Sequence, residues 1–354
     1  MIKKRTTIMD VAASVGMSKS MVSSVLGKKP YCCASSATRV RIETAARRLG
    51  YRPNLLARGL KNGRSRVIGF INDSVHHEVS AQEIVYLTNA LLPLDYQVQV
   101  IYSRGEPCLR LAACNRLVDS GCDAIIVSGN LDFFEFTVPL PTFLINADLR
   151  GKDFAQTIFV DYRVGVEEGI ACLQKYGHEC IGMAVNYWQA FQQDQRKVAF
   201  AAFCQQAGIS DSEAMTLIFH GYEEITAERM RQFFQQQPAC TAFICSNDLV
   251  AMKLIRSLQQ LGLSVPKDIS VIGFDDNVAA DFFIPSLSSI RQPTENVIRE
   301  MVKLLSNVLD GKEQPVQHVV PCYLIKRDSI GPARKQRLFL SNKAIPDGST
   351  TNRN

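Results

Sequence analysis

The 354-residue sequence predicts an N-terminal all-α head followed by a two-lobed α/β core with parallel sheets. Three observations carry this prediction. Residues 7–26 contain two short amphipathic segments joined at a glycine, basic residues dominate the first 66 positions, and short apolar runs alternate with amphipathic helical stretches from Val67 onward. At about 100–200 residues per domain, the length accommodates a head and two lobes.

The head is predicted to be a helix-turn-helix. Gly16 lies where the backbone must turn sharply, and Ser18 is placed to cap the second helix. Such a cap leaves N–H groups near Lys19 and Ser20 facing outward, toward a phosphate or a base edge. A small helical hairpin could share this pattern, so the charge distribution is needed to separate the two interpretations. The apolar positions at helical spacing are Ile8, Val11, Ala12, Val15, Met17, Val22 and Val25.

The charge is distributed unevenly along the chain. Residues 1–66 hold 15 Lys or Arg against the two acids Asp10 and Glu43, a balance of +13. The whole chain holds 40 basic and 34 acidic residues, so residues 67–354 hold 25 against 32, a balance of −7. A basic head of this density indicates phosphate binding that weakens steeply as salt rises.

The core sequence alternates between two kinds of segment. Continuous apolar runs joined by helices predict parallel sheets covered on both faces. The expected strands are at 67–71, 97–102, 123–127, 142–146, 158–160, 181–185, 242–246 and 270–274, and the expected helices at 81–92, 109–118, 198–206 and 249–261.

Several separate motifs resemble the lactose/galactose repressor family of bacterial transcription regulators. The similarity runs from Thr7 to about Ser329. The resemblance implies a DNA-binding helix-turn-helix over 1–52, a hinge helix and linker over 53–66, and a periplasmic-binding-protein-like effector-binding and dimerisation domain over 67–331. The tail over 332–354 has few apolar residues and is expected to be disordered. The motifs are Asp10, Val11, Ala12, Gly16, Ser18, Val22 and Ser23, the third-helix segment 38–49, Gly50–Asn54, and the hinge segment 57–60.

The resemblance also implies which residues contact DNA. They are Thr7, Lys19, Ser20, Met21, Ser23, Ser24, Asn54, Ala57 and Leu60. Leu60 would be wedged into the minor groove, although an ordinary linker hydrophobe is the alternative. Met21 stands where the family usually has Thr and Ser24 where it usually has Arg, which predicts a different operator preference. Gly59 weakens the hinge helix by about 1 kcal/mol relative to Ala, as suits a segment that folds only on DNA.

The resemblance places a small-molecule effector between the lobes. The candidate contacts are Asp73, Asp148, Arg196, Asn247, Asp275 and Gln292. Several follow apolar runs at predicted strand ends, where ligands of parallel sheets bind. Carboxylates, amides and a guanidinium suit the hydroxyls of a sugar or sugar derivative, but caps and turn formers would look the same. Residues 73–79 lack the family's stacking aromatics, and Trp188 could supply that face.

Other classes of function are weakly supported. No nucleophile elbow, phosphate loop, dinucleotide fingerprint or zinc helix is present, so no catalytic residue, metal ligand or cofactor is expected. The eleven cysteines show no CxxC spacing, and their odd number in a long chain without a signal peptide predicts reduced thiols and a cytoplasmic location. No run of 18 apolar residues is present, so no membrane span is expected. An exported sugar-binding protein or an enzyme on the same scaffold remains the alternative.

The expected partners are a double-stranded DNA operator and a carbohydrate effector. One recognition helix reads too few bases for genomic specificity, which predicts a homodimer on a pseudo-palindromic operator. We expect a repressor whose lobes respond to the effector.

Overall fold

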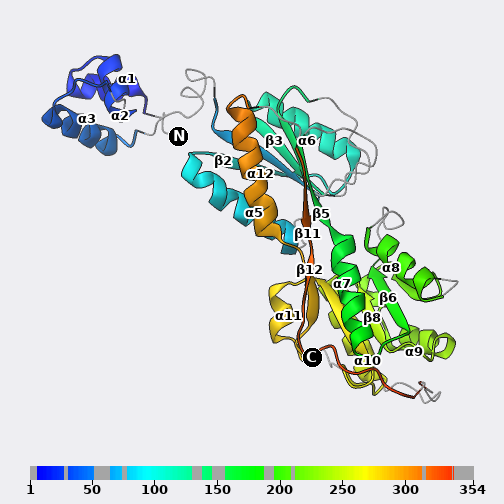
Figure 1. Ribbon diagram of the computed structural model, residues 1–354. Helices are drawn as coiled ribbons and strands as arrows, with labels where there is room; N and C mark the ends of the chain where they lie inside the picture. Colours follow the sequence, from blue (N-terminus) through cyan, green and yellow to red (C-terminus); the bar gives the residue numbers. More distant parts are fainter. Residues whose placement is uncertain are drawn as a thin grey trace. The chain divides into compact units, whose positions relative to one another are not determined.

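The computed structural model describes residues 6–27, 31–51, 64–73, 78–129, 138–145, 156–186, 195–208, 212–312, 316–336 and 338. The chain divides into two compact units, Met1–Arg66 and Val67–Asn354 (Figure 1). Each unit is described separately below.

The first unit holds three helices, α1 (Ile8–Val15), α2 (Lys19–Leu26) and α3 (Ser36–Arg48). Gly16 adopts φ +64° after α1, and the Ser18 hydroxyl accepts the Met21 N–H at 3.2 Å, as the sequence predicted. Thr7 caps α1 together with Asp10 in a reciprocal capping box. The small shared core consists of Val11, Ala12, Val15, Val22, Val25, Ile42, Ala45 and Ala46.

The second unit contains two lobes. Lobe 1 is built on a fully parallel sheet of strand order β11-β5-β4-β3-β1-β2. Its strands are β1 (Val67–Asn72), β2 (Gln97–Tyr102), β3 (Ala124–Ser128), β4 (Thr142–Ile145), β5 (Gln156–Asp161) and β11 (Val316–Pro321). Its helices are α5 (Glu78–Leu91), η1 (Leu92–Leu94), α6 (Pro107–Asp119) and α12 (Thr294–Leu309).

Helices cover both faces of the lobe 1 sheet. α5 and α12 lie side by side on one face, where Ile68 and Phe70 are buried. α6 covers the other face, where its Leu117 packs with Ile71 and would collide with any β-carbon at Gly69. Successive residues of β1 therefore serve opposite sides, which explains why this strand reads as a continuous apolar run.

Lobe 2 repeats this architecture with strand order β12-β10-β9-β8-β6-β7. All pairs are parallel except β10 with β12, which is antiparallel. Its strands are β6 (Ile181–Asn186), β7 (Thr216–Phe219), β8 (Ala242–Cys245), β9 (Ser270–Asp275), β10 (Ser288–Arg291) and β12 (Tyr323–Ile325). Its helices are α7 (Tyr162–Lys175), α8 (Gln195–Gln206), η3 (Tyr222–Glu224), α9 (Ala227–Gln236), α10 (Asp248–Gln260) and α11 (Val278–Phe282).

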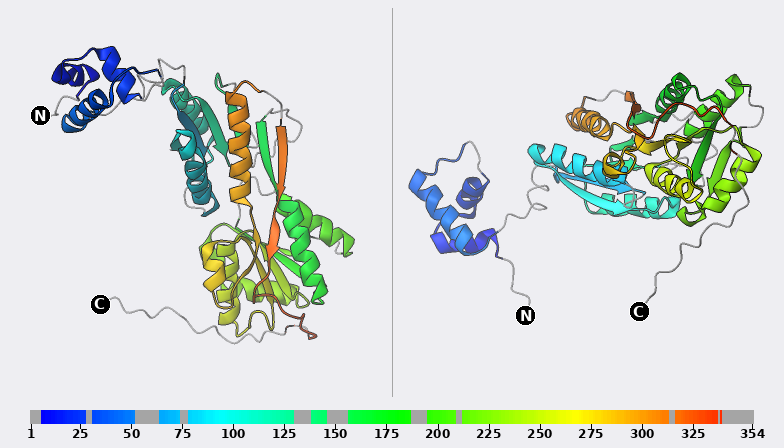
Figure 2. Two further views of the ribbon diagram at one scale, coloured as in Figure 1. Left: turned by 60° about the vertical axis from the view of Figure 1, so that its left-hand side comes forward. Right: turned by 90° about the horizontal axis from the view of Figure 1, so that it is seen from below.

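The described chain passes between the lobes at three places. β5 leads into α7, β10 leads into α12, and β11 leads into β12 (Figure 2). The carboxyl ends of β5, β10 and β11 lie at these crossings, so the polar residues that follow them are held near the junction of the lobes. None of the helices among the described residues is long and apolar enough to span a membrane.

The start of the predicted disordered tail was placed too early. Ala333 donates its N–H to the Tyr176 carbonyl at 2.9 Å, and the Arg334 guanidinium donates to the carbonyls of Asp268 (3.1 Å), Pro238 (3.3 Å) and Cys240 (2.5 Å). Side-chain hydrogen bonds to distant carbonyls fix this segment, and such contacts leave no trace in a composition-based prediction.

Candidate functional site

The amino end of α2 is the part of the first unit best placed to meet a ligand. Lys19 and Ser20 are exposed in the first turn of α2, whereas Met21, Ser23 and Ser24 are half-buried on its sides. The Thr7 hydroxyl is engaged with Asp10, donating to its carboxylate at 2.8 Å. Asn54, Ala57 and Leu60 lie outside the described residues.

Some of the basic residues in the first unit stabilise the fold instead of facing outward. Arg41 on α3 donates to the Val15 carbonyl at 2.9 Å, which satisfies the end of α1. Arg39 donates to the Cys32 and Ala34 carbonyls at 2.7 and 3.2 Å and so fixes the loop before α3. The outward basic surface is therefore smaller than the charge count alone suggested.

In the second unit, two predicted effector residues meet at the carboxyl ends of neighbouring strands. The Gln292 amide, directly after β10, donates to the Asp275 carboxylate at 2.6 Å. Asp275 and Asp276 have φ of +97° and +53°. Non-glycine residues in this region are uncommon and concentrate at functional sites.

Arg196 and Asn247 lie in the same lobe. The Arg196 guanidinium lies over the rings of Tyr162 and Phe274, 5.2 and 4.9 Å from their centroids, and donates to the Ser246 carbonyl at 2.7 Å. Since Phe274 directly precedes Asp275, Arg196 is held beside that strand end. Asn247 caps α10 by accepting the Val250 N–H at 2.9 Å, so its oxygen has the structural role that the alternative interpretation proposed.

Asp73 occupies a different environment. Its carboxylate forms an ion pair with the buried Arg110 guanidinium at 2.9 Å and accepts the Ser103 hydroxyl at 2.6 Å. Both oxygens are thus engaged within lobe 1, which argues against the predicted effector role. Asp148 and Trp188 lie outside the described residues.

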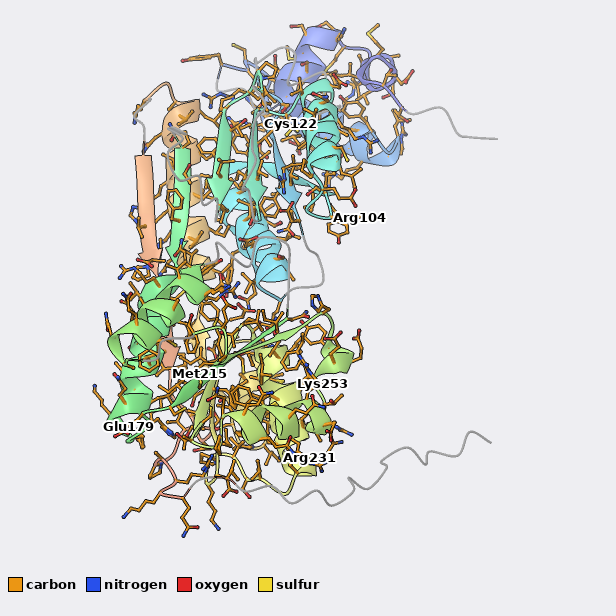
Figure 3. The ribbon with its side chains drawn as sticks, turned by 90° about the vertical axis from the view of Figure 1, so that its right-hand side faces the viewer. Arg104, Cys122, Glu179, Met215, Arg231 and Lys253 are labelled. Carbon is orange, nitrogen blue, oxygen red and sulfur yellow. The ribbon has the colours of Figure 1, made fainter. Side chains whose placement is uncertain are left out.

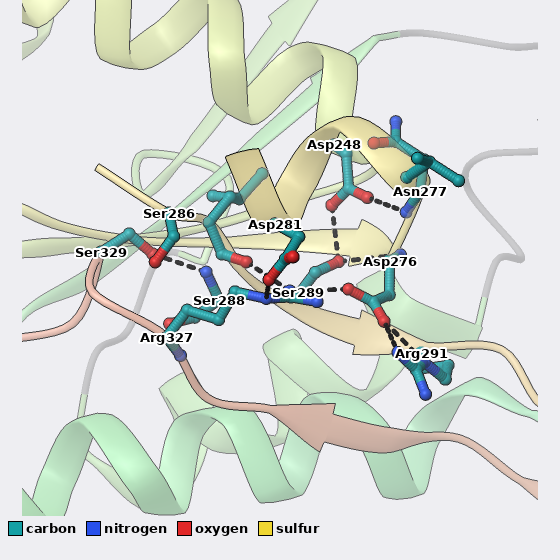
Figure 4. A network of polar contacts seen from close by, with 12 residues as sticks. Asp248, Asp276, Asn277, Asp281, Ser286, Ser288, Ser289, Arg291, Arg327 and Ser329 are labelled. Carbon is teal, nitrogen blue, oxygen red and sulfur yellow. Dashed lines mark hydrogen bonds and ion pairs between the residues drawn. The ribbon is translucent and has the colours of Figure 1, made fainter. Parts of the chain in front are cut away.

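The sequence analysis missed a network of polar contacts around the buried carboxyl groups of Asp248 and Asp276 (Figure 4). Asp248 accepts the Ser289 hydroxyl at 2.5 Å and the Asn277 N–H at 2.7 Å. Burial raises the pKa of the Asp248 carboxyl to about 8. A β-carbon at Gly273 would lie 2.0 Å from the Asp248 Oδ1, so only glycine allows this approach.

Asp276 is the charged counterpart of Asp248 in this network. Its side chain is 1% exposed and accepts Arg291 at 2.5 Å and Arg327 at 2.7 Å. Two guanidinium groups compensate for burying this carboxylate. The three residues fix the loop between β9 and α11, which directly follows Asp275.

Lobe 1 contributes its own buried acid. Glu83 on α5 accepts the Ser128 hydroxyl at 2.7 Å and the Asn72 amide at 3.1 Å, at the carboxyl ends of β3 and β1. Burial raises the pKa of Glu83 to about 7. The only signal for Glu83 in the sequence is an acidic residue among apolar residues on one face of a predicted helix.

A cavity of about 620 Å³ lies between the two lobes. Gln82 and Tyr86 on α5 line one side, and Asp275, Gln292 and Arg327 of lobe 2 line the other. Its size falls within the range of small-molecule sites. Among the described residues, no cluster of His, Cys, Asp or Glu is arranged to hold a metal ion.

Comparison with known proteins gives two matches to family models. Residues 170–330 match a periplasmic binding protein-like domain, and residues 7–54 match the bacterial regulatory proteins of the lacI family. This chain belongs to the lacI family. The prediction from the sequence motifs is therefore confirmed.

Relatives of this lacI-family chain align with it over nearly their whole length. The HTH-type transcriptional regulator AscG of Escherichia coli (strain K12) is 28% identical over 93% of this chain and 100% of its own length. The HTH-type transcriptional repressor PurR of Pectobacterium atrosepticum is 27% identical over 94% of this chain and 99% of its own. These relatives are transcription regulators and not enzymes.

Solved structures show the same fold. A lac repressor dimer bound to operator and the anti-inducer ONPF aligns with a TM-score of 0.79 and 23% identity over 93% of this chain and 100% of that one. A CelR–cellobiose complex aligns with a TM-score of 0.65 and 22% identity, over 92% of this chain and 100% of that one. The predicted helical head and α/β core with parallel sheets are thus confirmed.

Proposed function

We propose that this lacI-family regulator represses transcription by placing α2 in the major groove of a pseudo-palindromic operator. The observation that carries the proposal is the exposed amino end of α2, with Lys19 and Ser20 in its first turn, on a unit with a net charge of +13. Helix N–H groups and a lysine suit phosphate oxygens and guanine edges. Asn54, Ala57 and Leu60 remain proposed hinge contacts.

The test is selection of bound fragments from host genomic DNA by the full chain at about 150 mM salt, followed by anisotropy titrations of the enriched site. If Lys19 contacts a phosphate, Lys19→Ala should reduce the slope of log binding constant against log salt concentration by about one. If Lys19 contacts a base edge, the variant should instead lose base specificity at one position of the operator. Lys253→Ala removes the same charge from an exposed position of α10 (Figure 3) and should change neither. Equal affinities and salt slopes for both variants and the parent would refute the assignment of α2.

The proposed effector is a carbohydrate, bound where strand ends of lobe 2 face lobe 1. Support comes from the Asp275–Gln292 pair, from Arg196 stacked beside it, and from the cavity that Asp275 and Gln292 line. Carboxylate and amide groups at adjacent strand ends can bind neighbouring hydroxyls. The CelR complex, of the same fold, holds cellobiose.

Calorimetric titration with a panel of mono- and disaccharides tests the effector class. Asp275→Asn should lower the affinity for the saccharide about tenfold or more, because hydrogen bonds to a charged acceptor contribute about 1.5–3 kcal/mol. Asp119→Asn, at an exposed end of α6, is the matched control. Unchanged affinity in Asp275→Asn would remove this residue from the site, and binding of a non-carbohydrate metabolite alone would overturn the class.

The proposed oligomer is a homodimer. α11 and the residue pair after it expose Val278, Phe282 and Ile284, which are 67%, 70% and 84% exposed. An apolar patch of this kind suits a second copy of the chain. In sedimentation velocity, Phe282→Arg should shift the protein toward monomer, whereas Leu111→Arg on α6 should not. A monomer in the parent protein, with and without operator, would contradict the proposal.

A further inference from the structure

Two cysteines lie at the amino ends of neighbouring strands in lobe 2. The proposed effector residues lie at the opposite, carboxyl ends of the strands of this sheet. Cys180 directly precedes β6, and Cys240 lies just before β8. The Thr241 N–H donates to the Cys180 carbonyl at 3.0 Å, which extends the β6–β8 register to Cys180. Figure 3 labels Glu179, the residue before Cys180, on the part of lobe 2 that points away from lobe 1.

The Cys240 sulfur reaches the face of the sheet on which Gly182 lies. A β-carbon at Gly182 would lie 3.3 Å from the Cys240 sulfur, and Gly182 shares its face of β6 with Cys180 because side chains alternate along a strand. The Cys240 thiol donates to the Ala242 carbonyl at 3.4 Å, and its proximity is the largest cause of the lowered pKa of the Cys180 thiol. Both are free cysteines.

The backbone spacing suits a disulfide. Adjacent strands lie about 4.8 Å apart and rise about 3.3 Å per residue, so residues offset by one position have Cα atoms about 5.8 Å apart. Disulfides bridge Cα atoms separated by about 4.4–6.8 Å. Cys240 lies one residue before Thr241, the partner of Cys180 across the two strands, so this spacing suits a Cys180–Cys240 disulfide.

The surroundings make the two thiols unequal. Cys180 is half-buried, and the neighbouring Cys240 thiol together with the positive charge of Arg334 lowers its pKa. Cys240 is buried, and burial raises its pKa. Arg334 is held at this place by its hydrogen bond to the Cys240 carbonyl. A more acidic, reachable thiol beside a buried one is the arrangement of an attacking and a resolving cysteine.

We propose that Cys180 and Cys240 form a peroxide-sensitive modification site. The Cys180 thiolate attacks hydrogen peroxide: an S–O bond forms, the O–O bond breaks, and the departing hydroxide takes a proton to become water. The Cys240 sulfur then attacks the Cys180 sulfenic acid: an S–S bond forms, the S–O bond breaks, and water leaves with the thiol proton. Two thiols are oxidised to a disulfide, and one peroxide is reduced to two waters.

Other cysteines provide internal comparisons. Cys172 on α7 is also half-buried, but burial raises its pKa. Cys204 on α8 is buried and interacts electrostatically with Cys180, and burial raises its pKa to about 11. The site therefore has one alternative resolving thiol, Cys204, and one comparable unpaired thiol, Cys172.

The experiment treats the full-length protein with graded hydrogen peroxide, alkylates the remaining thiols, and maps the peptides by mass spectrometry. We expect a Cys180–Cys240 cross-linked peptide, lighter by two hydrogen atoms, at peroxide doses that leave Cys172 fully alkylated. Cys204→Ser should form the same cross-link. Cys240→Ser should leave Cys180 as a sulfenic acid that dimedone traps, and Arg334→Gln should slow the reaction of Cys180 several-fold.

Two results would overturn the proposal: oxidation of Cys180 no faster than that of Cys172, or a cross-link from Cys180 to Cys204 in place of Cys240. The parent protein alone decides the first result, so a variant that fails to fold does not affect it. Circular dichroism of each serine variant establishes that its fold is retained before the peptides are compared.

Discussion

Replacing Asp248 by asparagine should change how the stability of the second unit depends on pH. In the native protein burial raises the pKa of Asp248 to about 8, whereas an unfolded aspartate titrates near pH 4. Between these values the folded state holds a proton that the unfolded state has released. Stability is then lost as pH rises from about 4 to about 8, and the loss is complete above the folded pKa.

The magnitude follows from the width of that window. Each pH unit costs about 1.4 kcal/mol, so the Asp248 contribution falls by at most about 5 kcal/mol between pH 4 and pH 8. Asparagine keeps an oxygen for the Asn277 N–H and places an amide donor toward the Ser289 hydroxyl. The variant should therefore retain the packing and lose the titration.

The assay is urea unfolding of both proteins by circular dichroism at half-unit steps from pH 5 to pH 8. The stability difference between parent and Asp248→Asn should move in favour of the variant by up to about 4 kcal/mol across this range. Asp119→Asn, exposed on α6, should leave the pH profile of the parent unchanged. Parallel profiles for the parent and Asp248→Asn would refute a neutral buried Asp248.

Three further predictions concern other described residues. Burial of Glu83 should cause a second loss of stability, between about pH 4.5 and the folded pKa of about 7, and Glu83→Gln should remove this loss. The same urea series measures the change, and a pH profile equal to that of the parent would contradict the prediction. Asp276→Asn breaks a buried pair with Arg291 and Arg327 and should lower the unfolding free energy by about 3 kcal/mol; a melting temperature equal to that of the parent would argue against this network. A β-carbon at Gly16 would have no atom within 4 Å, but φ at this position is +64°. Gly16→Ala should therefore destabilise the helical unit by about 1 kcal/mol through backbone strain alone. Amide exchange of α1 and α2 measures this loss, and protection equal to that of the parent would exclude the strain.

The boundaries of the predicted elements differ from the observed ones for local reasons. The third helix was predicted from Thr38 but begins at Ser36, because Ser35 caps it through the Thr38 N–H. The helix predicted from Ala81 begins at Glu78. α7, α9 and α12 were not predicted as helices.

Features that depend only on neighbours within one turn or one strand could be predicted from the amino-acid sequence. The Gly16 turn and the Ser18 cap require only residues up to three positions away, and the apolar runs of the strands reflect burial on both sheet faces. Charge and motif spacing then indicated the family, since each is a property of linear order.

Tertiary structure alone decided which distant polar groups meet. Asp73 pairs with Arg110 across 37 positions, and Asp248 meets Ser289 across 41. Sheet register and the crossings between lobes bring such groups together, so a strand-end carboxylate looks the same in sequence whether it faces a ligand or a buried arginine. The same holds for Cys180 and Cys240, whose contact depends on β6 lying beside β8. Local patterns specify elements, whereas the partners of buried charges and thiols depend on the packing of those elements.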